Sequence, residues 1–406
     1  MTGKTILILG GGVGGIVTAN ALRKQLGVEH RVIVADKRAE YVFTPSLLWV
    51  MVGWRRPQQI TKDLRRLLRP DVELVAAEAQ EIDLDGARVR SSNGDLNYDY
   101  LVVALGADLS PAAMPGFGEA AYTPFNLEGA SGLWLALQRF EGGRLGILVS
   151  GVPYKCPAAP YEMALLLDDH LRQRGIREKC ELQVYTPEPL PMSVAGPAMG
   201  HAVVSMLESK QIHFNPQLQP MRIDAERQEL IFTNRDAAPF DFLAATPPHR
   251  APPVAQESSL ANEVGWVPVD RCTLQTCAEN VYAIGDVTHV TLANGKPLPK
   301  AGVFADGQAH TVARRIAADI QGAGALAEYN GLGYCWIETG SGSAGFASGQ
   351  FYAEPDPLVP LPRSGRMWHW GKILFEQYWL GEGVTRGVSR LGLNLGGKVF
   401  GVPVGL

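Results

Sequence analysis

The sequence of 406 residues has few cysteines, no long apolar run and no excess of basic charge. Its five Cys are an odd number in a long chain, which argues against the disulfide framework of a small secreted protein. No stretch approaches the ~18 apolar residues that a transmembrane helix requires. The formal net charge of −4 gives no indication of nucleic-acid binding. The first residues also lack the features of a secretory signal peptide, and we expect none.

The eight His residues show no metal-ligand spacing, so we expect no metal site. Glycine, in contrast, is abundant, with 45 residues against a usual share of ~7%. Either many tight turns or close approach of the backbone to a ligand must account for this excess. An apolar fraction of 46% and a length of 406 residues favour a folded chain of two to three domains.

The first forty residues are typical of a strand, a glycine turn, a helix and a second strand, with expected ranges 6–9, 10–15, 16–26 and 31–36. The turn carries the G-x-G-x-x-G pattern at Gly10, Gly12 and Gly15, and Asp36 ends the second strand. Glycines allow the tight turn and let backbone N–H groups approach a pyrophosphate, and the carboxylate takes ribose hydroxyls. These residues together predict a dinucleotide site.

Two later segments indicate which dinucleotide binds. Apolar strands are expected to end at Gly106 and, far along the chain, at Gly285-Asp286. Flavoproteins of the glutathione-reductase-like superfamily carry similar segments in this order. The resemblance implies FAD as the cofactor, with Asp286 at its ribityl or pyrophosphate region.

This arrangement predicts an α/β fold of two Rossmann-like dinucleotide-binding domains, the second inserted in the first, followed by a C-terminal amphipathic segment. We expect a first FAD-binding part (1–108), a second Rossmann-like domain (109–250), the rest of the FAD-binding domain (251–330) and a C-terminal region (331–406). That last region would hold a redox cysteine, a quinone pocket and a membrane anchor.

The second unit lacks the glycines that a nicotinamide site needs. Only Gly151 remains after the expected strand 143–149, and Pro153, Pro157 and Pro160 follow, each without an N–H donor. Cys156 lies where the next helix is expected to begin. A helix N-terminus lowers a thiol pKa, so we expect a reactive thiolate there.

Cys156-Pro157, followed by Pro160-Tyr161-Glu162, resembles the sulfide:quinone oxidoreductases and the related flavocytochrome c sulfide dehydrogenases. The similarity extends to four other segments, namely 41–50 with Pro45 beside the flavin, 298–302 with Lys300, 333–335 with Cys335, and 368–378. The resemblance therefore spans almost the whole chain.

It implies that Cys156 and Cys335 form a redox pair that sulfide attacks, with electrons passing through FAD to a membrane quinone. Lys300 would bind FAD and place positive charge beside its reduced form. Glu162 would move protons near Cys156, or else only cap its helix. Phe346, Phe375 and Tyr378 would line the quinone slot.

One departure concerns the other thiols. Many relatives carry a third redox cysteine in the region that corresponds to 106–132, and this sequence has none there. Cys272 and Cys277 have the C-x4-C spacing of disulfide reductases but precede the wrong strand, so we interpret them as structural. Cys180 has no visible partner. The length of the sulfur chain formed therefore stays open.

The tail from residue 363 carries six Lys or Arg and two Glu, together with several Trp, Phe and Leu. That composition is typical of an interfacial anchor, which predicts a peripheral membrane protein, although the aromatic residues could instead cover the protein's own core. Two alternatives stay open: a type II NADH:quinone oxidoreductase, and a flavocytochrome c-like subunit that passes electrons to a haem partner. Relatives also suggest a homo-oligomer.

Overall fold

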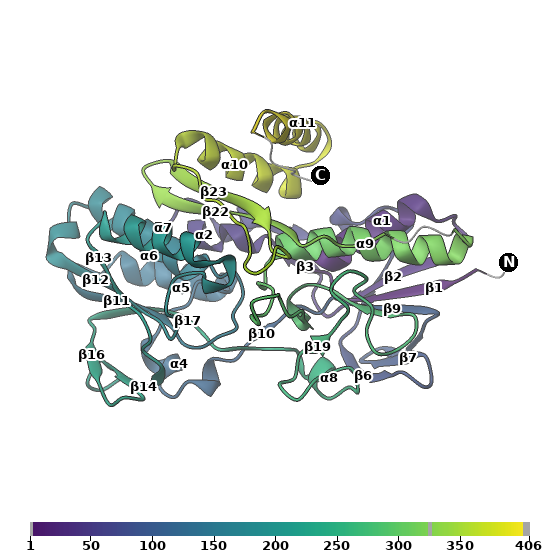
Figure 1. Cartoon of the computed structure of the whole chain (residues 1–406), viewed down its shortest axis with the longest axis horizontal. Coiled ribbons are helices and arrows are strands. Elements are labelled where there is room, and N and C mark those ends of the chain that lie inside the picture. Colours follow the sequence, from purple (N-terminus) through teal and green to yellow (C-terminus); the bar gives the residue numbers. More distant parts are fainter. Residues whose placement is uncertain (1–2, 324–326, 401–406) are drawn as a thin grey trace.

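The computed structural model describes residues 3–323 and 327–400. Figure 1 shows two α/β units side by side, with the C-terminal helices forming an outer layer above them. The predicted fold class, with two Rossmann-like units and a C-terminal segment, is confirmed.

The first unit is built on a parallel sheet of order β20-β9-β1-β2-β5. Its strands are β20 (Val281–Ala283), β9 (Tyr100–Val103), β1 (Thr5–Leu9), β2 (Arg31–Asp36) and β5 (Glu73–Ala76). Successive side chains of β1 are buried on both faces: Ile6 and Ile8 join one hydrophobic cluster, and Leu7 and Leu9 join another. A strand covered on both sides needs such an uninterrupted apolar run. Because β20 is a late segment, the chain returns to this sheet after the second unit.

Helices α1 (Val13–Gln25) and α9 (Gly302–Gln321) lie side by side on one face of this sheet (Figure 1). The other face packs against an antiparallel sheet of β6 (Ala79–Asp83), β7 (Arg88–Ser91) and β8 (Gly94–Asn97), and against α8 (Pro253–Gln256). Short elements complete the unit, namely β3 (Glu40–Val42), α2 (Leu47–Met51), α3 (Pro57–Ile60), β4 (Thr61–Asp63), β19 (Val267–Pro268) and β21 (Thr288–His289).

The second unit has a parallel sheet of order β13-β12-β11-β17. Its strands are β11 (Gly143–Val149), β12 (Cys180–Tyr185), β13 (Ile212–Asn215) and β17 (Phe242–Thr246), and its helices are α4 (Phe117–Ala120), α5 (Leu127–Leu137), α6 (Ala159–Gln173) and α7 (Pro197–Glu208). An antiparallel sheet of β14 (Pro220–Asp224), β15 (Glu229–Phe232) and β16 (Ala237–Pro239) is attached to it.

The two connections between the units pair with each other. Strand β10 (Asp108–Leu109) leads into the second unit, and β18 (His249–Arg250), which leads out of it, runs antiparallel beside β10. We keep the proposed domain boundaries at residues 108 and 250, which fall on this pair.

The C-terminal region begins with a hairpin of β22 (Leu332–Gly340) and β23 (Ser343–Gln350). The hairpin packs on α6 and is covered by α10 (Arg366–Leu380), beyond which lies α11 (Gly383–Phe400) (Figure 1). Within the residues that the structure describes, no helix combines the length and the apolarity that crossing a bilayer requires.

Candidate active site

The glycine turn between β1 and α1 has the geometry of a dinucleotide cradle. A Cβ on Gly10 would lie 2.4 Å from the carbonyl oxygen of Ala104, and one on Gly15 would lie 1.8 Å from the carbonyl oxygen of Gly10. Both glycines are therefore required by packing within the protein. Gly12, in contrast, faces open space, and no side chain caps α1 at this residue. The first N–H groups of α1 are thus left for a phosphate ligand.

Asp36 braces this turn from the end of β2. Its carboxylate accepts hydrogen bonds from the backbone N–H of Gly11 at 2.6 Å and of Arg38 at 2.8 Å. The carboxylate therefore lies directly beside the cradle. Its contact with ribose hydroxyls stays a prediction.

The segment Gly285-Asp286 follows β20, the neighbour of β9 in the same sheet. Gly285 has a left-handed φ of +72° and donates its N–H to Oε1 of Gln308 at 2.7 Å. Burial raises the pKa of Asp286, although Lys155 and Lys300 oppose the shift. Gly106 also has a φ of +72°, and a Cβ added to it would meet no atom within 4 Å, so it leaves room for a ligand.

Pro45 lies in the short 3-10 turn Thr44–Ser46 and is exposed. The open face at Gly12, the uncapped helix end and the left-handed glycines together fit FAD. When bound, FAD supplies the capacity to accept an electron pair and pass it on.

In the second unit, the acidic residue at the place of a ribose-binding carboxylate is hydrogen-bonded to side chains of the protein itself. Glu188 follows β12, close to where a nicotinamide-binding fold carries its ribose-binding acid. Its Oε2 accepts hydrogen bonds from the hydroxyls of Tyr154 at 2.7 Å and Tyr161 at 2.9 Å, and all three residues are buried. The proline loop therefore satisfies this carboxylate internally. Glu188 was not predicted from the sequence, although a Glu after an apolar strand was a usable signal.

Cys156 and Cys335 come from opposite ends of the chain to one place. Cys156 precedes α6, and its backbone N–H donates to the carbonyl oxygen of Lys300 at 2.7 Å. Cys335 lies in β22, which packs on α6, and the Cys156 thiol acts electrostatically on the pKa of Cys335. Both cysteines are free thiols. The hydrogen bond from Cys156 to Lys300 connects the loop of Cys156 to the segment that follows Gly285-Asp286.

The expected low thiol pKa at Cys156 is wrong. Burial raises the pKa of Cys156 to about 12, and Glu162 raises it further, while Lys372 opposes both. The Cys156 side chain is exposed, yet protein atoms surround it closely enough to desolvate the thiolate. Helix α6 begins only at Ala159, and Cys156 itself has a left-handed φ of 53°. Burial likewise raises the pKa of Cys335 to about 12.

Glu162 is buried in the first turn of α6 and pairs with Lys372 of α10, which is also buried. Burial raises the pKa of Glu162 to about 7, although the ammonium of Lys372 opposes the shift. A carboxyl group with a pKa near neutrality can both take up and release a proton there. Lys372 was not predicted from the sequence, where its signal was a lone charge within an aromatic and aliphatic run.

Lys300 is buried, and its side chain reaches the backbone of the Gly285-Asp286 turn. Its Nζ donates to the carbonyl oxygens of Asp286 at 2.7 Å and Thr288 at 3.0 Å, and lies 3.4 Å from the ring centroid of Trp266. Burial lowers its pKa to about 8, while Asp286 opposes the shift. A Lys in this position brings positive charge to the proposed flavin site.

Phe346 and Phe375 form an aromatic cluster with two residues of β22 that were not predicted from the sequence. Trp336 lies between them, with ring centroids 4.9 Å from Phe346 and 5.1 Å from Phe375. Tyr334 contacts both rings at 6.0 and 6.2 Å. Tyr378 packs against Trp379 and the guanidinium of Arg386, and it acts electrostatically on Tyr334 of this cluster. The structure thus places Phe346 and Phe375 in one aromatic cluster, with Tyr378 beside it.

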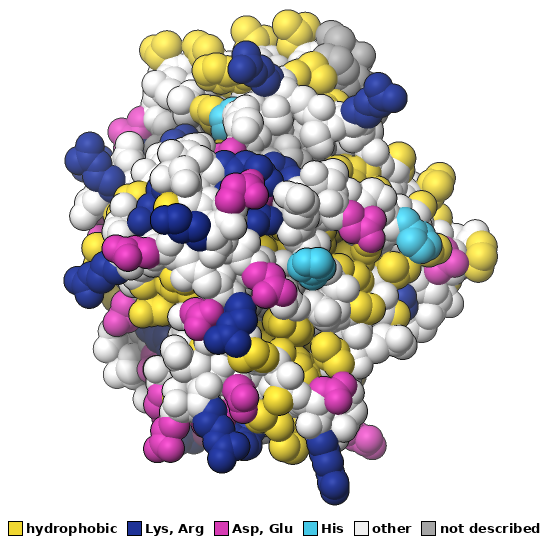
Figure 2. Space-filling view, turned by 90° about the vertical axis from the view of Figure 1, so that its left-hand side faces the viewer, with side chains coloured by type: hydrophobic (Ala, Val, Ile, Leu, Met, Phe, Trp, Pro, Cys, Tyr) yellow, Lys and Arg dark blue, Asp and Glu magenta, His cyan; other side chains and the backbone are white. Residues whose placement is uncertain are grey.

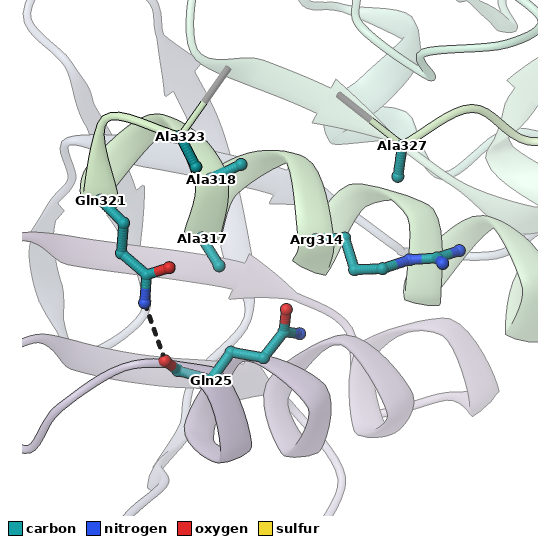
Figure 3. A pocket seen from close by; sticks show the side chains of 7 residues that line it. All are labelled: Gln25, Arg314, Ala317, Ala318, Gln321, Ala323 and Ala327. Carbon is teal, nitrogen blue, oxygen red and sulfur yellow. Dashed lines mark hydrogen bonds between the residues drawn. The ribbon is translucent and has the colours of Figure 1, made fainter. Parts of the chain in front are cut away.

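The remaining cysteines and the best-defined surface pocket lie apart from the site just described. Cys180, Cys272 and Cys277 are free thiols, and the described part of the chain has no cluster of residues that could hold a metal ion. A surface pocket lies between the ends of α1 and α9, where Gln321 donates to the carbonyl oxygen of Gln25 at 3.0 Å (Figure 3). Alanine, glutamine and arginine side chains line it, and none belongs to the predicted site.

The interrupted first unit and its glycine cradle define a flavin-dependent oxidoreductase. The chain belongs to the pyridine nucleotide-disulphide oxidoreductase family, whose model matches residues 4–309, and its cofactor is FAD.

Among curated relatives, the chain is similar to the mitochondrial sulfide:quinone oxidoreductase of Mus musculus, at 25% identity over 96% of this chain and 90% of the relative. It is 28% identical to the sulfide-quinone reductase of Aquifex aeolicus, over 93% of this chain and 90% of the relative. The crystal structure of the Aquifex aeolicus sulfide:quinone oxidoreductase superposes with a TM-score of 0.86 at 25% identity, covering 99% of this chain and 96% of the other.

Proposed function

We propose that this protein oxidises sulfide with its Cys156–Cys335 pair and passes the electrons through FAD to a quinone. The observation that carries the proposal is the meeting of the two thiols beside the loop that holds Lys300. Similarity over nearly the whole chain to sulfide:quinone oxidoreductases supports the same activity.

The residues have defined parts in this reaction. In the oxidised pair, hydrosulfide attacks one sulfur of the disulfide, so that an S–S bond to sulfide forms and the Cys156–Cys335 bond breaks. One cysteine becomes a persulfide and the other a thiolate. Glu162 takes the proton that the sulfur gives up, since its pKa lies near 7. Lys300 and Lys372 supply the positive charge that balances the anions formed at this site.

We expect sulfide, and not NADH, to bleach the flavin of the purified protein under anaerobic conditions. The carboxylate of Glu188 is bound to Tyr154 and Tyr161, and the proline loop offers few N–H groups to a second dinucleotide. Absorbance spectra recorded during titration with sulfide, then with a short-chain quinone, test donor and acceptor in one sample. Rapid bleaching by NADH would instead favour a type II NADH:quinone oxidoreductase.

We further propose that α11 holds the protein at a membrane surface, where a quinone substrate resides. Its apolar side chains are exposed: Val384 (82%), Val388 (62%), Leu391 (70%) and Leu395 (63%). Figure 2 shows hydrophobic side chains gathered at the top of the molecule, where the C-terminal helices lie, with Lys and Arg among them. An exposed apolar face with basic residues is suited to an anionic bilayer surface. Self-association into an oligomer stays a prediction.

A Leu391→Glu variant is expected to bind vesicles of mixed neutral and anionic lipid about 10- to 150-fold more weakly than the wild type, because an inserted Leu contributes about 1.5–3 kcal/mol. Co-sedimentation with vesicles measures the change. Leu135→Glu is the matched control, since Leu135 is 62% exposed on α5, far from α11 along the chain. Equal losses in both variants, or in neither, would contradict an anchoring role for α11.

A further inference from the structure

A buried cluster of four titratable groups extends from the thiol pair toward the outer side of α10. Its members are Glu162 of α6, Glu338 of β22, and Lys372 and His369 of α10. Glu162, Glu338 and Lys372 are 3%, 0% and 4% exposed, and the side chain of His369 is 17% exposed. The proposed reaction uses Glu162 and Lys372 but leaves Glu338 and His369 without a part.

Short polar contacts connect these groups. The Nζ of Lys372 donates to Oε1 of Glu162, and the backbone N–H of Glu338 also donates to the Glu162 carboxylate. The Nδ1 of His369 lies 2.9 Å and 3.0 Å from the two oxygens of the Glu338 carboxylate. Lys372 interacts electrostatically with both carboxylates. The four groups therefore form one electrostatic unit.

The charges of this unit do not balance without an additional proton. Two carboxylates face one ammonium, so the unit carries a charge of −1 when His369 is neutral, and one proton neutralises it. A neighbouring pair adds no net charge, because Arg55 and Glu376 pair with each other at 2.8 Å. The side chain of Trp49 lies between the two pairs, 4.6 Å from Arg55 and 5.0 Å from Lys372. Burial of the unit favours the neutral form of its inner carboxyl group and raises the pKa of Glu162 to about 7.

The two ends of the unit differ in their surroundings. Glu162 and Lys372 act on both thiols, so the inner end lies at the site where sulfur chemistry takes place. His369 lies in α10 between Met367 and Trp370, which are 44% and 62% exposed. Its ring packs against Trp49 and Trp54, with centroids 6.1 and 6.0 Å apart, which limits water to the outer end.

We propose that Glu338 and His369 are proton-transfer residues that carry the proton of the sulfur chemistry from Glu162 to the outer face of α10. This inference rests on the proposed oxidation of sulfide. Protonated Glu162 gives its proton to Lys372 as Lys372 gives one to Glu338, so the ammonium is unchanged. Glu338 then protonates Nδ1 of the Nε2–H tautomer of His369, the imidazolium releases its Nε2 proton to solvent, and proton exchange with solvent restores that tautomer. No electron moves in these steps, and one proton leaves for each one that Glu162 takes up.

The test compares His369→Ala, His369→Gln and Glu338→Gln with the wild type and with His213→Gln, an exposed histidine of β13. The FAD content of each purified protein reports folding. Stopped-flow absorbance then gives the rate of flavin reduction by sulfide across pH. We expect rates about 100-fold lower in the three cluster variants, no change in His213→Gln, and recovery of His369→Ala when imidazole is added to the buffer.

The outcomes separate this inference from the proposed function. If sulfide fails to reduce the wild-type flavin, the proposed function is wrong, whatever the variants do. If sulfide reduces the wild type and the cluster variants equally fast, with the same pH profile, Glu338 and His369 transfer no proton. Slower flavin reduction with an unchanged pH profile and no recovery by imidazole would show that both residues act only on the structure, and it would overturn the inference.

Discussion

Replacing either Cys156 or Cys335 by Ser is expected to lower sulfide-dependent flavin reduction by about 10³-fold or more, because a hydroxyl can form neither a disulfide nor a persulfide. The two losses should be nearly equal, and the double variant should be no slower, since the thiols act as one redox unit. FAD should still bind, because the cradle at Gly10, Gly12 and Gly15 belongs to the other unit.

Stopped-flow absorbance of the flavin, with sulfide in excess, measures these rates. Cys277→Ser is the matched control, since Cys277 is an exposed free thiol that lies outside the site. We expect it to react at the wild-type rate. A Cys156→Ser protein that reduced its flavin normally with sulfide would show that the thiol pair is not the entry point for electrons.

The high thiol pKa values make the direction of this chemistry specific. With pKa values of about 12, resting Cys156 and Cys335 are protonated near neutral pH and are weak nucleophiles. A reduced thiol of this pair is therefore a poor attacking group near neutral pH. The nucleophile is the incoming hydrosulfide, and the protein contributes the oxidised pair. The positive charge of Lys372 lowers the thiol pKa values and so stabilises a newly formed thiolate.

The features that could be predicted from the sequence are those that depend on short stretches of chain. The glycine turn, β1, α1 and β2 follow one another within forty residues, and each has a local signature in turn chemistry or apolar pattern. The late return to the first sheet was predicted from the resemblance to flavoproteins that carry a late strand ending in Gly-Asp, as β20 does before Gly285-Asp286.

What could not be predicted depends on partners far apart in the chain. Lys372 and Glu162 are separated by 210 positions, and neither neighbourhood states that the other will cover it. The pKa of Cys156 was misjudged for the same reason: the helix end is local, whereas the burial that outweighs it comes from distant segments. The internal hydrogen bonds of Glu188 likewise became visible only once the proline loop was placed beside β12.

Removal of the Lys372 charge is expected to cost about 3–5 kcal/mol of stability, since it leaves the carboxylate of Glu162 buried without its partner. The change is Lys372→Met, which keeps the length of the side chain. Unfolding in urea, followed by tryptophan fluorescence, measures it, because the Trp49 ring lies 5.0 Å from the Lys372 Nζ. Lys37→Met is the control: its pair with Glu78 is more than half exposed, and its loss should change the stability by about 0–1 kcal/mol.

The cost should depend on pH in a defined direction. Lys372 lowers the pKa of Glu162, so without it that pKa rises above about 7, and the carboxyl group is neutral when buried at lower pH. A folded-state pKa above the unfolded value means that stability falls as pH rises through it. The variant should therefore lose more stability at pH 8 than at pH 6, and adding Glu162→Gln should restore most of the loss. If the double variant were as unstable as Lys372→Met alone, the loss would not come from an unpaired Glu162 carboxylate, and the pairing explanation would be wrong.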